Sequence, residues 1–236
     1  MAVQELQKPT GEELYVLNAQ LASSTPQVII QWAADQYGDD LTLACSFGGI
    51  SGMALLDMSV KIKPSIEIFY IDTHFLFPET LKTRDIAMAR YHIRPVEYQP
   101  GITPQQQAEQ FGDELWKRNP DLCCAMRKVE TNKQALAGKA AWITGLRRDQ
   151  ASTRRNVQPV GWDEKFGLYK ISPLAHWDEK QVWQYIFEHE VPYNPLHDQG
   201  YPSIGCTNCT RKVGEDEEGR AGRWGDSKKV ECGLHR

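Results

Sequence analysis

The order of apolar and helical segments along the chain is the feature that most limits how it can fold. Short apolar runs lie at 41–47, 66–73, 95–99 and 140–146, and amphipathic stretches with helical spacing separate them. This alternation is typical of a parallel sheet that helices cover on both faces. We therefore expect an α/β fold with a mainly parallel sheet.

The helical segments carry recognisable start and stop signals. Thr10 and Glu13 form a T-x-x-E capping box, while Pro26 opens a second helix that Gly38 ends. Further helices are expected at 53–58, 78–92, 103–118 and 123–136.

The final part of the chain differs from the rest. After about residue 190 the sequence becomes polar and loop-rich, with too little apolar content for a separate domain. We expect one domain overall, made of N-terminal helices (1–40), an α/β core (41–190) and a loop-rich C-terminal tail (191–236).

Composition narrows the class of partner. The formal net charge of −4 argues against a nucleic-acid binder, which is normally basic. Four arginines against one aspartate at 147–155 favour a small anionic ligand, with a solvated charged face as the alternative. The sequence has neither a long apolar run nor a signal-peptide profile at its start, so we expect a cytoplasmic protein without a membrane span.

In parallel sheets, ligands bind at the carboxyl ends of the strands, where three loops of interest are expected. The first, S-F-G-G-I-S-G at 46–52, has glycines that allow close approach to a phosphate at a helix N-terminus. It matches neither of the common glycine-rich phosphate motifs, so a plain tight turn is the alternative. The others are D-T-H at 72–74 and G-L-R-R-D-Q at 145–150.

The cysteines are grouped rather than scattered. The six positions are Cys45, the adjacent pair Cys123 and Cys124, the C-x-x-C pair Cys206 and Cys209, and Cys232. Six are too few for a disulfide scaffold of this length. The two pairs together can bind zinc or an iron–sulfur cube, and adjacent cysteines favour the cube because each can bind a different iron. Zinc and buried or redox-active thiols remain alternatives.

The two single cysteines have different settings. Cys45 lies in an apolar run and is expected to be buried and inert. Cys232 is the fifth residue from the end of the sequence. A thiol with an ordinary pKa is only about 3% thiolate at pH 7. Basic residues such as Arg220, Arg223 and His235 would lower its pKa if the tail docks near them; an unpaired surface thiol is the alternative.

Together these motifs resemble the assimilatory sulfonucleotide reductases, in particular the iron–sulfur branch that reduces adenosine 5′-phosphosulfate (APS). The resemblance is carried by S-F-G-G (46–49), I-D-T-H-F-L-F-P-E-T (71–80), C-C-A-M-R-K-V (123–129), T-G-L-R-R-D-Q-A-S-T-R (144–154), G-C-T-N-C-T (205–210), R-A-G-R-W (220–224) and E-C-G-L-H (231–235). It implies a Rossmann-like adenine-nucleotide α-hydrolase fold, whose tail is a cluster-binding segment followed by a mobile catalytic end.

The resemblance also implies a reaction in two steps. The Cys232 thiolate attacks the sulfur of APS and expels AMP, which leaves a thiosulfonate on the enzyme. Thioredoxin then releases sulfite. We expect this reductant to be a separate protein, because no thioredoxin-like domain follows His235 in the sequence. A [4Fe-4S] cluster is implied on Cys123, Cys124, Cys206 and Cys209, with a structural and electrostatic role shared with Lys128.

The family pattern assigns the remaining site residues. Ser46, Phe47, Gly48 and Gly49 would form the phosphate-side loop, and Asp72 and Thr73 would lie near the adenosine. The cations expected around the developing charge are Lys128, Arg147, Arg154, Arg220 and Arg223, and His235 would cap the closed tail. We also expect a homo-oligomer.

One departure from the family pattern leaves the substrate open. The loop reads G-G-I-S-G where APS enzymes usually carry two carboxylates, so Ser51 and Gly52 would leave room for a 3′-phosphate. Reduction of 3′-phosphoadenosine 5′-phosphosulfate (PAPS), or of both nucleotides, is therefore an alternative. An ATP pyrophosphatase on the same fold and a non-catalytic metal-binding redox sensor are further alternatives.

Overall fold

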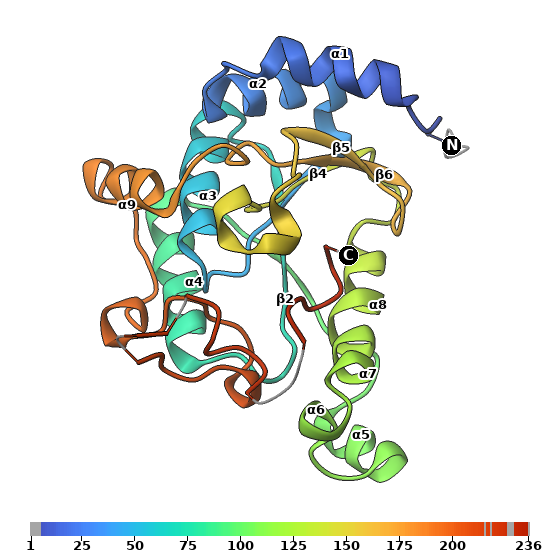
Figure 1. Ribbon diagram of the computed structural model, residues 1–236, viewed down its shortest axis with the longest axis vertical. Helices are drawn as coiled ribbons and strands as arrows, with labels where there is room; N and C mark the ends of the chain where they lie inside the picture. The colour runs from blue at the N-terminus through green and yellow to red at the C-terminus, as the bar shows by residue number, and fades with distance from the viewer. Residues whose placement is uncertain (1–5, 215, 218, 226–228, 236) are drawn as a thin grey trace.

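The computed structural model describes residues 6–214, 216–217, 219–225 and 229–235. Its centre is a six-stranded sheet with the order β3-β2-β1-β4-β6-β5 (Figure 1). The strands are β1 (Leu41–Ala44), β2 (Glu67–Ile71), β3 (Val96–Tyr98), β4 (Ala141–Ile143), β5 (Val160–Asp163) and β6 (Leu168–Ile171). All pairs are parallel except the antiparallel pair of β5 and β6, so the expected mainly parallel sheet is confirmed.

The helices follow the alternation that the sequence predicts. They are α1 (Gly11–Leu21), α2 (Pro26–Tyr37), α3 (Ile50–Ile62), α4 (Pro78–Tyr91), α5 (Pro104–Phe111), α6 (Leu115–Arg118), α7 (Pro120–Cys124), α8 (Glu130–Ala135) and α9 (Glu179–Glu188). The Thr10 capping box and the N-terminal Pro26 are both present, and Gly38 ends α2 with a φ of 53°. In the described ranges, no helix is long and apolar enough to span a bilayer.

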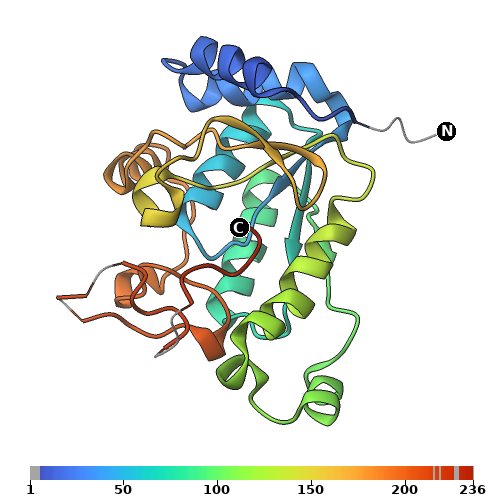
Figure 2. The ribbon, with the colours of Figure 1, turned by 45° about the vertical axis from the view of Figure 1, so that its right-hand side comes forward.

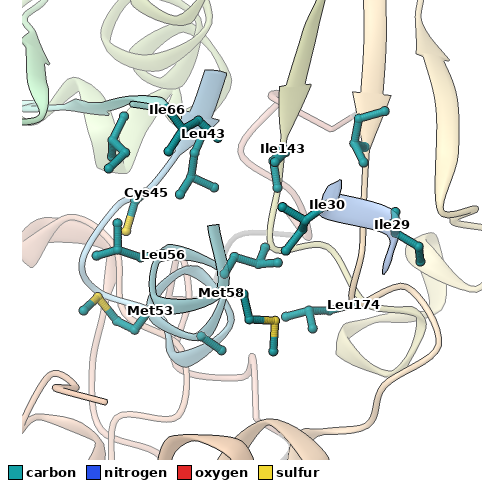
Figure 3. Close-up of a cluster of buried hydrophobic side chains, with 14 of the residues drawn as sticks. Ile29, Ile30, Leu43, Cys45, Met53, Leu56, Met58, Ile66, Ile143 and Leu174 are labelled. Carbon is teal, nitrogen blue, oxygen red and sulfur yellow. The ribbon is translucent and has the colours of Figure 1, made fainter. Parts of the chain in front are cut away.

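Side chains alternate between the two faces along each strand, and a hydrophobic core lies against each face. Ile68 and Tyr70 of β2 join the larger core, which includes residues of α2, α3 and α9. Phe69, between them, points to a smaller core with Trp142 of β4 and residues of α8. Figure 3 shows side chains of the larger core from β1, α2, α3 and β4 packed together, with Cys45 among them.

The β5–β6 hairpin was not predicted from the sequence. Its turn closes with a hydrogen bond of 2.7 Å from Gly167 N to Asp163 O, and Gly167 has a φ of 71°. The side chain of Asn18 in α1 pairs with Val160 of β5, donating to its carbonyl at 2.8 Å and accepting from its amide at 3.0 Å. The helix therefore satisfies backbone groups on an edge strand that would otherwise be open to other chains.

The predicted helix at 103–118 is wrong as a single element. Gly112, with a φ of 78°, ends α5, and Glu114, with a φ of 52°, precedes α6. The Arg118 guanidinium folds back and donates to the carbonyls of Phe111 at 2.6 Å and Asp113 at 2.9 Å. These bonds satisfy carbonyls that the end of α5 leaves open.

The predicted helix at 123–136 is confirmed, and it starts earlier, at Pro120. A π-helical turn at Ala125–Val129 interrupts it between α7 and α8. Such turns are rare and common at functional sites, because the extra residue changes the direction of the side chains that follow. Here the turn carries Arg127 and Lys128.

The C-terminal segment returns to the sheet after α9. Figures 1 and 2 show it running past α4 and then turning to end beside α8. An isolated bridge joins Thr210 to Arg223 within it. At the end, Gly233 packs against Val129, since a Cβ on this glycine would lie 3.4 Å from the Val129 side chain.

A buried carboxylate fastens α3, the helix that begins at the 46–52 loop. Asp57 is 1% exposed and accepts from Lys61 at 2.7 Å, Tyr91 at 3.0 Å and Tyr185 at 2.6 Å. We expect Asp57→Ala to lower the free energy of unfolding by about 3 kcal/mol, because two tyrosine hydroxyls lose their acceptor. Asp57→Asn should cost about 1 kcal/mol, since the amide oxygen still accepts. Urea denaturation followed by circular dichroism measures both.

The matched control is Asp35→Asn on α2, an exposed carboxylate that accepts from Gln31 at 2.8 Å. It should change the free energy of unfolding by less than about 0.5 kcal/mol. Equal, small losses in all three variants would mean that the buried carboxylate does not fasten α3.

Candidate functional site

A cavity of about 1170 Å³ opens at the carboxyl ends of the central strands. Its walls come from the loops after β1, β2 and β4, and from the C-terminal segment. The lining includes parts of 44–52, 69–73, 142–155, 202–206 and 219–235. Parallel pairing places the strand ends at one edge of the sheet, so segments far apart in the sequence meet around one space.

The loop after β1 follows a tight path. Phe47 has a φ of 56°, a conformation that few residues other than glycine adopt, and its buried ring packs edge-on against Tyr70 with centroids 5.6 Å apart. A Cβ on Gly48 would lie 3.3 Å from Ile204, and one on Gly145 only 3.0 Å from Ser51. These close approaches hold the N-terminus of α3 and its free N–H groups toward the cavity, as the glycine-rich loop predicts.

All five cations predicted from the sequence line this cavity. They are Lys128, Arg147, Arg154, Arg220 and Arg223. Burial lowers the pKa of Arg220 to about 10, helped by the nearby positive charge of Arg154. A cluster of desolvated cations attracts anions strongly, because the surrounding dielectric is low.

Arg147 already has protein partners in the cavity wall. Its Nε and Nη2 donate to the Asp149 carboxylate at 2.9 and 3.0 Å, and its Nη1 donates to Ser51 Oγ. The Ser51 hydroxyl therefore accepts a hydrogen bond from Arg147, at a loop position where the family pattern usually has a carboxylate.

Lys128 lies between the cavity and the paired cysteines. It lines both the large cavity and a small adjoining pocket. Burial opposes its charged form, but Cys206 and Cys232, in their negatively charged thiolate forms, raise the pKa of Lys128 overall. Its ammonium group therefore stays charged where sulfur atoms from two parts of the chain come together.

The small pocket contains all four paired cysteines. Cys123, Cys124, Cys206 and Cys209 line it, together with aromatic and basic side chains. Burial raises the pKa of Cys209 to about 12, and it also raises the pKa of Cys123 and Cys124. Burial acts the same way on Cys206, yet Lys128 and a 3.2 Å contact with Thr73 Oγ1 lower the pKa of this thiol.

Buried donors without a partner surround the same pocket. Arg127 is fully buried and uses Nε and Nη1 on Gln107 at 2.7 Å and the Thr73 carbonyl at 3.1 Å. Among the residues that the structure describes, its Nη2 has no partner, nor does Trp224 Nε1. Buried polar groups are normally satisfied, so these donors favour an acceptor between the thiols. In the described ranges, no three His, Cys, Asp or Glu side chains converge on a point that could hold a single metal ion.

The C-terminal residues close one side of the cavity. Cys232 is half-buried and lines it, and His235 stacks on Trp142 with ring centroids 5.7 Å apart. Burial, followed by the charges of Lys170 and the nearby arginines, lowers the pKa of His235 well below its ordinary value. The imidazole is therefore neutral at physiological pH and packs as an aromatic ring.

The structure brings most of the predicted site residues to one cavity, and their roles stay predictions. Ser46, Gly48, Gly49, Thr73 and His235 line the cavity with the five cations and Cys232. Phe47 and Asp72 do not line it: the Phe47 ring is in the core, and Asp72 accepts from His74 N at 2.8 Å in a local turn. Cys45 is buried, and its Sγ contacts the Gly52 carbonyl at 3.6 Å.

Trp142 and Asn132 in the cavity lining, and Glu231 behind it, were missed in the sequence analysis. Glu231 pairs with Arg154. Trp142 and Asn132 are fully buried, and within the described part of the chain their Nε1 and Nδ2 atoms have no partner. Asn132 comes one helical turn after Lys128, which was the signal for it. Trp142 belongs to the apolar run of β4, so the sequence indicates a strand residue and not a site residue. The partner of Glu231 depends on how the tail folds back, and local sequence does not reveal that.

Comparison with known proteins agrees with this geometry. Residues 40–212 match the model of the phosphoadenosine phosphosulfate reductase domain. The adenosine 5′-phosphosulfate reductase of Salinibacter ruber is 45% identical over 96% of this chain and 90% of its own length. That of Halalkalibacterium halodurans is 48% identical over 88% of this chain and 90% of its own length.

Solved structures support the same assignment. The phosphoadenylyl-sulfate reductase of Candida auris, solved as a phosphate complex, superposes with a TM-score of 0.77 at 35% identity, over 87% of this chain and 99% of its own. The FMN adenylyltransferase of Candida glabrata shares the fold alone, with a TM-score of 0.59 at 17% identity over 90% of this chain and 71% of its own. The predicted Rossmann-like adenine-nucleotide α-hydrolase fold is confirmed, and the chain belongs to the phosphoadenosine phosphosulfate reductase domain family.

Proposed function

We propose that this chain reduces APS to sulfite and AMP through a thiosulfonate on Cys232, with electrons from a separate thioredoxin. The observation that carries the proposal is the position of Cys232, which lines one cavity with five cations and the glycine-rich loop. The relatives that are 44–48% identical are named adenosine 5′-phosphosulfate reductases, which supports APS as the substrate.

In the first step, the Cys232 thiolate attacks the sulfur of APS and a new S–S bond forms. The bond between this sulfur and the bridging phosphate oxygen breaks, and its electron pair leaves with AMP. Negative charge grows on the phosphate and sulfonate oxygens, and Lys128, Arg220 and Arg223 line the cavity to stabilise it. The N-terminus of α3 provides N–H donors on the phosphate side.

In the second step, a dithiol reductant attacks Cys232 Sγ. Sulfite leaves with the electron pair of the S–S bond, and a mixed disulfide remains. The second thiol of the reductant then releases Cys232 as a thiol and becomes oxidised to a disulfide, so the reductant supplies both electrons. The C-terminal segment must expose Cys232 for this attack, since the thiol is half-buried against the cavity.

We further propose that Cys123, Cys124, Cys206 and Cys209 hold a [4Fe-4S] cluster. The donor set fits, because four thiols line one pocket, and the buried Arg127 Nη2 and Trp224 Nε1 beside it have no partner in the described ranges. A cube binds each thiolate through a separate iron, so the thiols need not converge on one point. When bound, the cluster supplies fixed charge beside Lys128, the cation shared by the small pocket and the large cavity.

PAPS is a second candidate substrate. The loop at 46–52 contains no carboxylate, and the structural relative of Candida auris is a phosphoadenylyl-sulfate reductase.

Three further expectations stay predictions. They are the cytoplasmic location, the homo-oligomer, and the division of the chain at residues 40 and 190, with 191–236 as cluster-binding segment and catalytic tail.

The covalent intermediate gives the most direct test. With APS but no reductant, intact-mass spectrometry should detect one sulfonyl group on the protein, and peptide mapping should place it on Cys232. Cys232→Ser should remove this adduct and reduce sulfite formation by at least about 1000-fold, because the nucleophile is lost. Cys45→Ala is the matched control and should keep the adduct; an adduct on any residue but Cys232 would reject the mechanism.

The cluster has its own test. Anaerobically purified protein should be brown and contain about four iron and four sulfide per chain. Cys209→Ala should lose most of this iron, whereas Cys45→Ala should retain it, since Cys45 is buried away from the small pocket. A colourless protein with a single zinc would contradict the assignment.

Substrate choice is tested by competition between APS and PAPS with one thioredoxin. We expect kcat/KM to be at least about tenfold higher for APS. The extra phosphate of PAPS must lose its hydration, while Arg147 and Arg148 after β4 are already bonded to protein acceptors. A higher kcat/KM for PAPS would make it the substrate.

A further inference from the structure

The Glu231 carboxylate beside the reactive thiol is buried inside the cavity wall. It is 2% exposed, although it belongs to a segment without helix or strand. A buried carboxylate is unfavourable unless it is paired and hydrogen-bonded. The contacts that compensate this burial therefore identify what Glu231 does.

Glu231 forms a two-pronged ion pair with Arg154. Arg154 Nε donates to Oε1 at 2.6 Å and Nη2 donates to Oε2 at 2.6 Å. Thr153 Oγ1 adds a bond of 3.1 Å to Oε1, and Arg220 Nη2 lies 3.6 Å from Oε2. Burial opposes ionisation, but these donors lower the pKa of Glu231, so it remains a carboxylate.

Arg154 has no guanidinium nitrogen left without a bond in this arrangement. Two nitrogens bind Glu231, and the third, Nη1, donates to Gln150 Oε1. The family pattern predicts that Arg154 binds the substrate. In the closed tail, however, its preferred two-pronged partner is a carboxylate of its own chain.

The tail makes further contacts with the rest of the chain. Lys165 Nζ donates to the Gly233 carbonyl at an exposed site, and Lys229 pairs with the exposed carboxylate of Asp121. His235 adds a stacking contact on Trp142. Glu231 is thus the tail carboxylate whose pairing is both buried and fixed in direction by two parallel bonds, one residue from the thiol.

Resting on the proposed function, we infer that Glu231 and Arg154 are a pair of positioning residues that dock the tail and hold Cys232 over the cavity. Arg154 then acts on the reaction through Glu231, and the substrate's charge falls to the other cations of the cavity. The ion pair must be formed during sulfonyl transfer, and it must break so that the reductant can reach Cys232. An ion pair suits this exchange, because water can solvate both partners once the tail leaves.

The test combines Glu231→Gln, Arg154→Gln and the double variant. Hydrogen exchange, followed by mass spectrometry of the peptide that contains 229–235, measures docking without turnover. Each single variant should exchange this peptide about tenfold faster and slow single-turnover sulfonylation of Cys232 by about tenfold or more. The double variant should be no slower than either single one, since the pair acts as one unit.

The matched control is Glu217→Gln. Glu217 makes the same two-pronged bond with Arg211, at 2.6 and 2.7 Å, in the same C-terminal segment but at the surface. It should leave exchange of the tail peptide and the rate of sulfonylation unchanged. A matching rise in exchange there would mean that the readout reports a general loosening of the segment, which overturns the inference.

Binding of AMP separates a positioning residue from a substrate ligand. The affinity for AMP should change less than about twofold in both single variants. Arg154 would instead be a substrate ligand if Arg154→Gln alone lowered the affinity for AMP about tenfold and its effect on the sulfonylation rate added to that of Glu231→Gln. That result would overturn the inference. Unchanged exchange in both variants, or an unprotected tail in the unmodified protein, would also overturn it.

Failure of the proposed function gives a different result. If unmodified protein forms no adduct on Cys232 with APS, the proposed reaction is wrong. Exchange of the tail peptide would still report in that case whether Glu231 and Arg154 dock the tail.

Discussion

Parallel pairing of β1 with both β2 and β4 is the constraint on which the rest of the structure depends. It places the ends of three strands at one edge, so that the loop at 46–52, Thr73 and the arginines after Leu146 meet around a single cavity. Covering both faces of the sheet with helices buries the strands and leaves this edge as the accessible part. The site follows from topology before any side chain is considered, and side chains then determine its chemistry.

The chemistry is dominated by the need to keep several buried positive charges stable next to one another. The chain meets that need with acceptors of its own: Asp149 and Ser51 for Arg147, Glu231 for Arg154, and thiols for Lys128. Each pairing reduces the desolvation cost of a cation while the protein is without substrate. An anionic substrate must therefore bind beside cations that already have partners within the protein.

Most of the fold could be predicted from local signals. Capping residues at Thr10 and Pro26 and the alternation of apolar runs fixed the first four strands and most helices. The β5–β6 hairpin was missed because its short strands have no apolar run, and the helix at 103–118 was overextended because the left-handed turn at Gly112 outweighs helix propensity. In the site, cysteine spacing and the arginine-rich loop were informative. The pairing of Glu231 with Arg154 joins residues 77 positions apart, and no periodicity encodes such a contact.

The proposed function places two opposing requirements on the end of the chain: Cys232 must lie in the cavity, and a second protein must also be able to reach it. Gly233 has a φ of 90° and lies against Val129, so a residue with a side chain would be strained there and the tail would follow another path. This turn lets Glu231 point into the cavity wall and His235 reach Trp142, with Cys232 between them. No helix or strand fixes these residues, so the closed position rests on a few side-chain contacts that can break without unfolding the sheet. The proposed nucleophile, which would react in a closed cavity and then meet a second protein, is better placed on such a segment than on the rigid core.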